Sequence, residues 1–290
     1  MTLSEGGRTG QPVPGVIALL VSDVDGTLVT DNKQLTASTM QAVRSLAEAG
    51  IAFAITSSRP PIGLRTLISS LAITTPVGAF NGGLIVSPEG LEPIEGNPLP
   101  ADIARRAIAY LTRRRIDIWF DTDRDWLVLD RDRPYVDLEI RTIASAPVLV
   151  ETFDQPRTID RCYKIVGVSH DFAALAQCEH DLSGELGPNA TVNRSQLYYL
   201  DVTHPEANKG YMVRALSRLL SIPPQAIAAI GDGRNDIAMF DASGLAIAMG
   251  NADDEVKARA QFVTASNEQD GFASAVKQWV LPRAPPRQRG

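Results

Sequence analysis

The segment VSDVDGTLVT (21–30) decides the fold expected for this chain of 290 residues. An apolar run, VIALLV (16–21), leads into two aspartates, Asp23 and Asp25, and Gly26 follows at once. Residues i and i+2 of an extended strand point to the same side, and glycine lets the chain turn sharply. The segment therefore predicts a buried strand whose end presents two carboxylates to one crevice.

Four further apolar runs predict strands of the same kind. They are continuous rather than alternating, which is typical of strands buried on both faces of a parallel sheet. These runs span residues 51–56, 76–81, 226–232 and 245–251, and helical patterns follow or separate them at 36–50, 209–221 and 253–260. The alternation indicates the α/β class, with a doubly wound, Rossmann-like parallel sheet. In such folds the ligand crevice lies beyond the carboxyl ends of the strands.

The middle of the chain has a different pattern. Segments 116–121 and 125–130 are rich in aromatic residues and predict a hairpin, and two further strand patterns occur at 162–169 and 195–203. Alternating polarity is typical of a sheet with one exposed face. We therefore expect an inserted α+β domain over residues 85–202.

The remaining segments, 1–84 and 203–290, are expected to form one discontinuous core domain. The polar ends at 1–14 and 283–290 are predicted to be loose tails. Gly82 and Gly83 lie near one crossing between the domains, where glycine can absorb the backbone changes of a hinge.

Charge and cysteine content narrow the class of partner. The chain has 28 Lys and Arg against 34 Asp and Glu, a formal net charge of −6, which argues against nucleic acid or anionic membranes as partners. Cys162 and Cys178 are too few and too far apart for a disulfide framework. We expect a cytoplasmic protein with reduced thiols.

A second acidic turn, GDGRND (231–236), follows another apolar run. Asp232 falls at the strand end, where its carboxylate could reach the same counter-ion as Asp23, and Asn235 and Asp236 could orient the loop or waters on that ion. Either turn alone could be a solvated strand end. Two at matching strand ends favour Mg²⁺, which takes few protein carboxylates and completes its coordination with water and phosphate oxygens.

Ser57 and Lys209 add the features of a phosphate site. Ser57 follows a strand and offers a hydroxyl, and Lys209 begins a helical pattern and offers a positive charge near a helix N-terminus. Each residue by itself is more often structural, but their order and placement favour a shared role.

In chain order, DVDGT (23–27), ITSSRP (55–60), Lys209 and GDGRND resemble the four motifs of the haloacid dehalogenase (HAD) superfamily of phosphotransferases. The long insertion between the second and third motifs resembles the cap of the Cof-type (IIB, C2B-capped) sugar-phosphate phosphatases. Further similar segments are FNGG (80–83), MGNADDEVKARA (249–260) and SNEQDGFA (266–273).

The resemblance implies roles for the acidic residues. It makes Asp23 the nucleophile and Asp25 the general acid and base of an HAD-like phosphoric monoester hydrolase. A carboxylate attacking phosphorus splits hydrolysis into formation and breakdown of an aspartyl-phosphate. The resemblance also implies Mg²⁺ held by Asp23, the Asp25 carbonyl and Asp232, and we add Asn235 and Asp236 to the candidate metal site.

The same resemblance implies how a substrate is held. Ser57 and Lys209 would clamp the phosphoryl oxygens, and Arg59, Asn81 and Gly82 match positions that lie near substrate in relatives. The expected partner is a small phosphomonoester, with a sugar phosphate as the favoured class. The particular substrate, the cap residues that recognise it and the oligomeric state cannot be read from the chain.

Two features of the insertion have competing interpretations. Trp119 and Trp126 could contact a sugar, although aromatic residues on a small sheet more often build its core. The segment DTDRDW (121–126) begins like a calcium loop, but Trp126 stands where an EF-hand requires glycine. We interpret it as part of a hairpin.

Two rival functions use similar residues. A phosphomutase of the phosphomannomutase type carries a similar cap and forms the same kind of intermediate. A phospho-receiver module also gathers aspartates, a hydroxyl and a lysine around Mg²⁺, but it requires neither a positioned acid such as Asp25 nor a cap.

Overall fold

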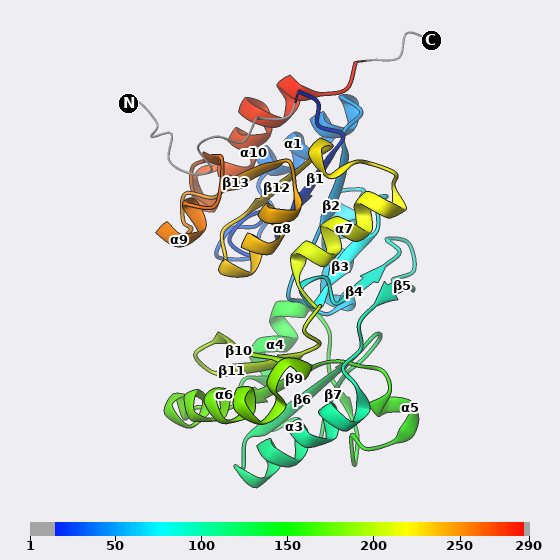
Figure 1. Cartoon of the computed structure of the whole chain (residues 1–290), viewed down its shortest axis with the longest axis vertical. Coiled ribbons are helices and arrows are strands. Elements are labelled where there is room, and N and C mark those ends of the chain that lie inside the picture. Colours follow the sequence, from blue (N-terminus) through cyan, green and yellow to red (C-terminus); the bar gives the residue numbers. More distant parts are fainter. Residues whose placement is uncertain (1–14, 287–290) are drawn as a thin grey trace.

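The computed structural model describes residues 15–286, which form two bodies stacked along the long axis of the molecule (Figure 1). The expected tails at 1–14 and 287–290 lie outside the described residues. Residues 283–286 are described, and the Arg283 carbonyl accepts a hydrogen bond from the Ile17 N–H at 2.7 Å. The expectation that residues 283–290 form a loose tail is therefore wrong for Arg283, which is hydrogen-bonded to the segment that leads into the first strand.

The first body is built on a parallel sheet with the order β14-β13-β12-β1-β2. Its strands are β1 (Leu19–Ser22), β2 (Ala52–Ile55), β12 (Ile227–Gly231), β13 (Leu245–Ala248) and β14 (Phe262–Val263). Four of the five predicted apolar runs supply the four longer strands, which confirms the doubly wound α/β core. The short edge strand β14 was not predicted, because its two residues carry no run of their own.

Helices cover both faces of this sheet (Figure 1). On one face Leu20 and Ile247 pack with Leu46 of α1 (Ala37–Glu48), and α10 (Gly271–Ala275) completes that layer. The layer on the other face consists of α7 (Lys209–Leu219) and α8 (Ile237–Ala242), and the short α9 (Asp254–Lys257) lies nearby. There Val21 packs with Val213 of α7, and α8 contributes to the same apolar cluster. Strand residues thus alternate between two apolar layers, although most strands are continuous apolar runs.

The predicted strand at 76–81 is placed differently from the others. It forms β3 (Val77–Ala79), which pairs antiparallel with β4 (Leu84–Val86), and β4 pairs with β5 (Pro93–Gly96). A single bridge between Thr56 and Gly78 joins this small sheet to the edge of the parallel one. Helix α2 (Arg65–Ser70) precedes it in the chain.

The position of β4 changes the expected domain limits. Leu84 and Val86 belong to the apolar cluster of the first body, so the limit expected between residues 84 and 85 falls inside a core strand. The limit expected between residues 202 and 203 likewise falls inside a strand, β11 (Tyr199–Thr203). The chain crosses between the two bodies at residues 97–100 and 204–208 instead. Gly82 and Gly83 precede the first crossing, and β4 and β5 lie between them and it.

The second body carries a six-stranded sheet with the order β10-β11-β9-β6-β7-β8, antiparallel except for the short β7–β8 pair. Its strands are β6 (Asp117–Thr122), β7 (Trp126–Val128), β8 (Val148–Leu149), β9 (Cys162–Val168), β10 (Thr191–Gln196) and β11 (Tyr199–Thr203). Its helices are α3 (Ala101–Arg113), α4 (Val136–Ile143), α5 (Pro156–Ile159) and α6 (Phe172–Leu186). The hairpin predicted at 116–130 is confirmed, and the segment 195–203 proves to contain the turn between β10 and β11.

The two faces of this sheet have different surroundings. Phe120 and Ile165 face α3 and α6 and form the main apolar cluster of the second body. Trp119, Trp126 and Val166 lie on the opposite face with residues of α4, where Ile62 of the first body packs against them. This second face is therefore turned toward the core (Figure 1).

Within residues 15–286, every helix falls short of the length and apolar character that crossing a bilayer requires.

Candidate active site

The centre of the site is a buried ion pair between Asp23 and Lys209. Asp23 directly follows β1 and is 5% exposed, and Lys209 is the first residue of α7 and 1% exposed. The Lys209 ammonium donates to Asp23 Oδ1 and to Asp236 Oδ1, each at 2.5 Å. A cation at a helix N-terminus opposes the helix dipole, so these carboxylates must compensate for its position. Burial disfavours the ammonium, but the two carboxylates outweigh it and raise the pKa of Lys209.

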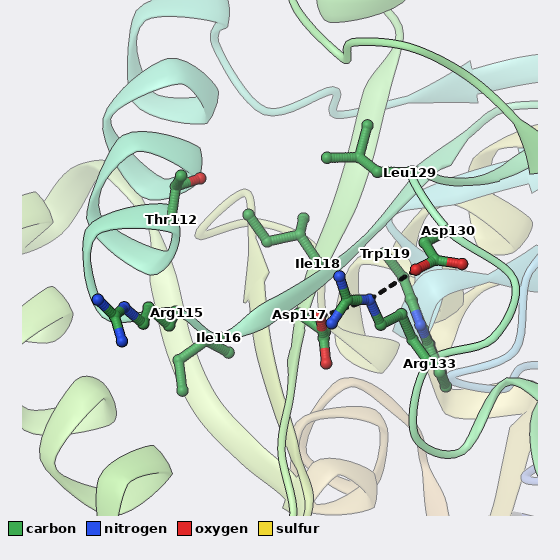
Figure 2. Close-up of a pocket in the computed structure, with 9 residues that line it drawn as sticks. All are labelled: Thr112, Arg115, Ile116, Asp117, Ile118, Trp119, Leu129, Asp130 and Arg133. Atoms are coloured by element: carbon green, nitrogen blue, oxygen red, sulfur yellow. Dashed lines mark ion pairs between the residues drawn. The ribbon is translucent and has the colours of Figure 1, made fainter.

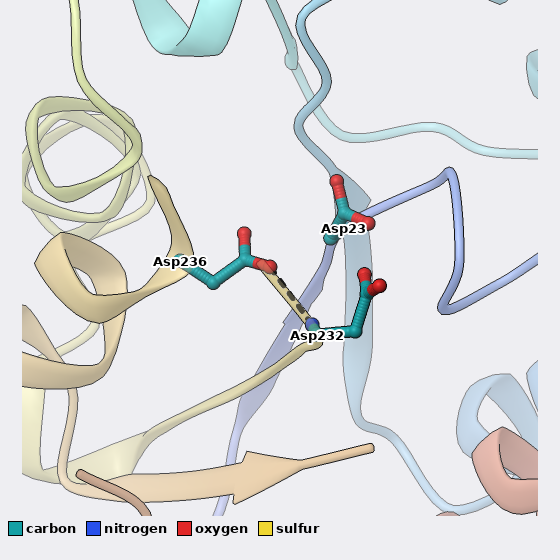
Figure 3. A group of neighbouring side chains, drawn as sticks. All are labelled: Asp23, Asp232 and Asp236. Carbon is teal, nitrogen blue, oxygen red and sulfur yellow. Dashed lines mark hydrogen bonds between the residues drawn. The ribbon is translucent and has the colours of Figure 1, made fainter. Parts of the chain in front are cut away.

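Asp23, Asp232 and Asp236 form a group that we call the core acidic group (Figure 3). One ligand atom from each lies within 4.8 Å of the others. Burial raises the pKa of Asp23 although Lys209 opposes the shift, and burial and the Asp236 charge raise that of Asp232. Like charges held together in a buried place favour a cation as their counter-ion.

One oxygen of this group is left without a partner. Asp23 Oδ2 is buried and makes no hydrogen bond within residues 15–286. Asp236 is the opposite case, because its Oδ2 accepts from the N–H groups of Asp232 and Gly233 at 2.9 and 2.8 Å while its Oδ1 accepts from Lys209. The donor set fits a divalent cation, with Asp23 and Asp232 the more available ligands and Asp236 mainly fixing the loop.

The glycines of both motifs are needed for this packing. Gly26 has a φ of +81°, and a Cβ there would lie 2.3 Å from Asp232 Oδ2. A Cβ at Gly231 would lie 2.3 Å from Asp236 Oδ2. Thr27 donates from Oγ1 to Asp232 Oδ1 at 3.0 Å, which joins the two motifs directly. The spacing of DVDGT and GDGRND therefore reflects close contact between two strand-end turns.

Asp25 is held apart from the core acidic group. Arg59 donates to both of its carboxylate oxygens, at 2.9 and 2.7 Å, and the Lys33 ammonium lies 2.8 Å from Oδ1. Burial alone raises the pKa of this carboxyl, but the Arg59 and Lys33 contacts outweigh it and lower the pKa. Lys33 was not predicted as a site residue, because it lies in a polar turn at a φ of 61° and belongs to no recognisable pattern.

Of the other predicted site residues, Asn81 and Asn235 line the cavity described below, and Ser57 and Gly82 do not. Asn81 accepts a hydrogen bond from the Asn235 amide at 2.9 Å, and both residues line the same cavity as Asp232. Ser57 is buried, and its Oγ accepts the Arg59 N–H at 3.2 Å. Gly82 does not line the site, because it packs against Asn208 at the start of α7, where a Cβ would meet the Asn208 carbonyl at 2.9 Å.

A cavity of about 810 Å³ lies between the two bodies and is lined by some of these groups, while Ser57, Lys209 and Asp236 lie behind its wall. The first body lines it with residues that include Asp23, Asp25, Lys33, Arg59, Asn81, Asp232 and Asn235. The second body lines it with residues that include Trp119, Asp121, Trp126, Glu139, Lys164, Tyr198 and Tyr199. Trp119 and Trp126 are buried in a small apolar cluster, as the core interpretation expects, and they also line the cavity. Contact with a sugar stays a prediction.

A smaller cavity of about 250 Å³ lies on the second body (Figure 2). Arg133 there lies 2.9 Å from Asp130 and 3.6 Å from Asp117. Both carboxylates of this cavity thus pair with Arg133, and none of the core acidic group lines it. The larger cavity is the candidate active site.

Comparison with known proteins identifies the family. Residues 20–276 match the model of the haloacid dehalogenase-like hydrolases, so the chain belongs to that family. A haloacid dehalogenase-like hydrolase from Bacteroides thetaiotaomicron has the same fold, with a TM-score of 0.83 and 26% identity over 90% of this chain and 99% of that one. The HAD subclass IIB sugar phosphatase BT4131 is similar in fold, with a TM-score of 0.76 and 22% identity over 89% and 97% of the two chains.

A relative in Escherichia coli is named pyridoxal phosphate phosphatase YbhA. It is 30% identical over 277 residues, which cover 92% of this chain and 98% of that protein. The family match and these relatives confirm the recognition of a Cof-type HAD protein and the expectation of an HAD-like phosphatase.

Proposed function

We propose that this enzyme is a Mg²⁺-dependent phosphatase that hydrolyses a small phosphomonoester, in particular a sugar phosphate, through an aspartyl-phosphate on Asp23. The observation that carries the proposal is the buried Asp23 carboxylate, which has one oxygen held by Lys209 and the other without a partner beside the cavity. A carboxylate fixed at one oxygen and free at the other is suited to attack phosphorus.

The chain's own residues supply both halves of the reaction. In the first half Asp23 forms a bond to phosphorus, the ester P–O bond breaks, and Asp25 gives a proton to the leaving oxygen. In the second half Asp25 takes a proton from water, whose oxygen bonds to phosphorus and releases phosphate from Asp23. The Arg59 and Lys33 contacts keep Asp25 ionised, which suits the second half. For the first half Asp25 must first take a proton from solvent, which requires Arg59 and Lys33 to turn from its carboxylate toward the substrate.

The remaining groups bind and orient the phosphoryl group. Lys209 restrains Asp23 and contributes positive charge. Arg59 and Asn81 line the cavity, and the buried Ser57 offers its hydroxyl to a phosphoryl oxygen. Asp23, Asp232 and the Asp25 carbonyl would hold Mg²⁺, with Asn235 and Asp236 in supporting positions. When bound, the cation offsets negative charge on the transferring group.

A sugar phosphate is favoured by the composition of the cavity wall. The second body lines it with carboxylates, an ammonium and aromatic rings, which suit a polar leaving group with hydroxyls and an apolar ring face. Relatives differ in this respect, since one is named for pyridoxal phosphate and another for sugars. Leaving-group recognition therefore has to be measured for this chain.

Phosphate release from a panel of esters tests the proposal. The panel contains hexose and pentose phosphates, polyol phosphates, pyridoxal phosphate, nucleotides and p-nitrophenyl phosphate, each with Mg²⁺ and with an excess of chelator. We expect repeated turnover with Mg²⁺, highest kcat/KM for a sugar or polyol phosphate, and loss of activity with chelator. Activity that survives exhaustive chelation would refute the metal-dependent site.

A further inference from the structure

A group of charged residues lies on the core-facing side of the second body's sheet. Asp121 of β6 is directly opposite Lys164 of β9, and alternate residues of each strand share this face. The Lys164 ammonium lies 3.1 Å from a carboxylate oxygen of Asp201 on β11. Glu139 approaches from α4 and accepts a hydrogen bond from the Tyr199 hydroxyl at 3.4 Å. We call Asp121, Glu139 and Lys164, which line the large cavity, the cap subsite.

The charges of this group do not balance. Three carboxylates, from Asp121, Glu139 and Asp201, surround the single ammonium of Lys164. Burial raises the pKa of Asp121 to about 7, against the opposing effect of Lys164, and burial also raises the pKa of Glu139. Burying an ionised carboxylate without a partner is unfavourable, so such a group is retained at a stability cost.

Asp121 is the least satisfied member. Its side chain is 6% exposed, lines the cavity and makes no hydrogen bond or ion pair within residues 15–286. Asp123, two residues further along the chain, provides the contrast, because Arg161 donates to its carboxylate at 2.6 Å. A structural network would be expected to satisfy Asp121 as it satisfies Asp123.

Unpaired donors accompany the unpaired acceptor. The indole N–H groups of Trp119 and Trp126 are buried and have no hydrogen-bond partner in the described part of the chain. These two side chains are 3% and 4% exposed, and both line the same cavity. Residues of the cavity wall thus include unpaired donors as well as an unpaired acceptor.

The chemistry of the wall restricts the leaving group. A second phosphate or a carboxylate would meet the excess negative charge of Asp121 and Glu139. A purely cationic group could donate to the carboxylates but would leave Lys164 and the indole N–H groups without acceptors. A hydroxyl both donates and accepts, so an uncharged polyol can satisfy all of these groups.

We propose that the cap subsite binds the hydroxyls of an uncharged polyol or sugar leaving group and discriminates against leaving groups that carry a second anion. This inference rests on the proposed phosphatase function. Asp121 and Glu139 accept hydrogen bonds from the leaving group's hydroxyls, and Lys164 donates to one of them.

A matched pair of substrates tests the discrimination. Glucitol 6-phosphate and 6-phosphogluconate share the phosphate and the hydroxyls of C2 to C5 and differ at C1, where the first carries a hydroxyl and the second a carboxylate. p-Nitrophenyl phosphate lacks hydroxyls and reports the reaction at Asp23. Values of kcat/KM are measured for the wild type, for Asp121→Asn, and for the control Asp117→Asn, which removes a carboxylate from the same strand outside the large cavity.

The wild type is expected to favour glucitol 6-phosphate over 6-phosphogluconate by about tenfold or more, since a hydrogen bond to a charged group contributes roughly 10- to 100-fold. Asp121→Asn should narrow that ratio and lower kcat/KM for glucitol 6-phosphate about tenfold more than for p-nitrophenyl phosphate. Asp117→Asn should leave the ratio unchanged. If Asp121→Asn does not fold, Glu139→Gln makes the same test from α4.

Three results would overturn the inference. Equal kcat/KM for the matched pair in the wild type would show that the wall does not discriminate. An unchanged kcat/KM ratio in Asp121→Asn or Glu139→Gln would show that the cap subsite does not recognise the leaving group. The proposed phosphatase function would not be affected by that result. Absence of phosphate release from every ester, including p-nitrophenyl phosphate, would reject the proposed function and this inference with it.

Discussion

The core acidic group and the cap subsite both gather carboxylates around one lysine, buried in the first and half-buried in the second, but they are built differently. In the core, Lys209 lies between Asp23 and Asp236 at 2.5 Å from each, and strand-end turns fix the group. In the cap, Lys164 contacts Asp201 at 3.1 Å, while the Asp121 side chain makes no hydrogen bond or ion pair with any residue from 15 to 286. The tightly paired group suits chemistry that must be the same for every ester, and the loosely paired one suits recognition of a particular leaving group.

The largest effect is expected at the nucleophile. Asp23→Asn keeps the shape of the side chain but cannot form the aspartyl-phosphate, so kcat should fall by at least about 10³-fold with the fold retained. Turnover is measured with p-nitrophenyl phosphate and folding by circular dichroism. Asp160→Asn, an exposed change in the second body, serves as the control. An Asp23→Asn enzyme with wild-type turnover would remove the core acidic group from the chemistry.

The next prediction concerns stability in the core. Lys209→Met leaves Asp23 and Asp236 buried without their shared cation, and breaking a buried pair in this way costs about 3–5 kcal/mol. We expect a decrease of that size in the free energy of unfolding, measured by urea denaturation. Lys277→Met, at an exposed position, should change it little. Equal stability of the two variants would mean that the Lys209 contacts contribute nothing to the fold.

Metal affinity should depend on Asp232. Asp232→Ala removes a carboxylate from the core acidic group, and the Mg²⁺ concentration giving half-maximal activity should rise at least about tenfold. A Mg²⁺ titration of phosphate release measures this change. Asp254→Ala, an exposed carboxylate of α9, should have the wild-type requirement. An unaltered requirement in Asp232→Ala would place the metal elsewhere.

The smallest effect is expected in the cap and depends on pH. Burial raises the pKa of Asp121 from its ordinary value of 3.8 to about 7 in the folded protein, with Lys164 opposing this shift and Glu139 and Asp201 adding to it. The native state therefore binds more protons than the unfolded state between these values, and Asp121 reduces stability as pH rises through that range.

Asp121→Asn should accordingly raise the Tm at pH 8 by a few degrees, since 1 kcal/mol shifts Tm by about 2–4 °C in domains of 150–250 residues. At pH 4 the two proteins should melt at nearly the same temperature, because Asp121 is largely protonated in the native protein and about half protonated when unfolded. Thermal melts at both pH values measure the difference. A lower Tm for Asp121→Asn at pH 8 would show that Asp121 stabilises the cap and is not an unsatisfied binding group.

The core could be predicted from the sequence because its information is local. Continuous apolar runs identified β1, β2, β12 and β13, and the motifs at their carboxyl ends contain the charged residues that meet in the structure. The parallel arrangement brings those ends to one edge, so residues 205 positions apart, Thr27 and Asp232, become hydrogen-bond partners. The family resemblance supplied the roles.

The cap subsite could not be predicted because its information is not local. Asp121, Lys164 and Asp201 lie on three strands that pair only after folding, and each is one polar residue in an alternating strand. Asp121 was even considered as part of a calcium loop. Lys33 and the position of β4 were missed for the same reason, since only the tertiary contacts distinguish them from ordinary turn and strand residues.

Oxygen transfer from labelled water is the measurement that tests the central claim most directly. The substrate identified in the panel is turned over many times in ¹⁸O-labelled water, and phosphate is analysed by mass spectrometry. A phosphatase acting through Asp23 should release stoichiometric phosphate with one oxygen from water in each molecule, because water attacks the aspartyl-phosphate at phosphorus. Isomerised substrate without label in phosphate would contradict this account and support a mutase, and a stable phosphoprotein with neither product would support a receiver module.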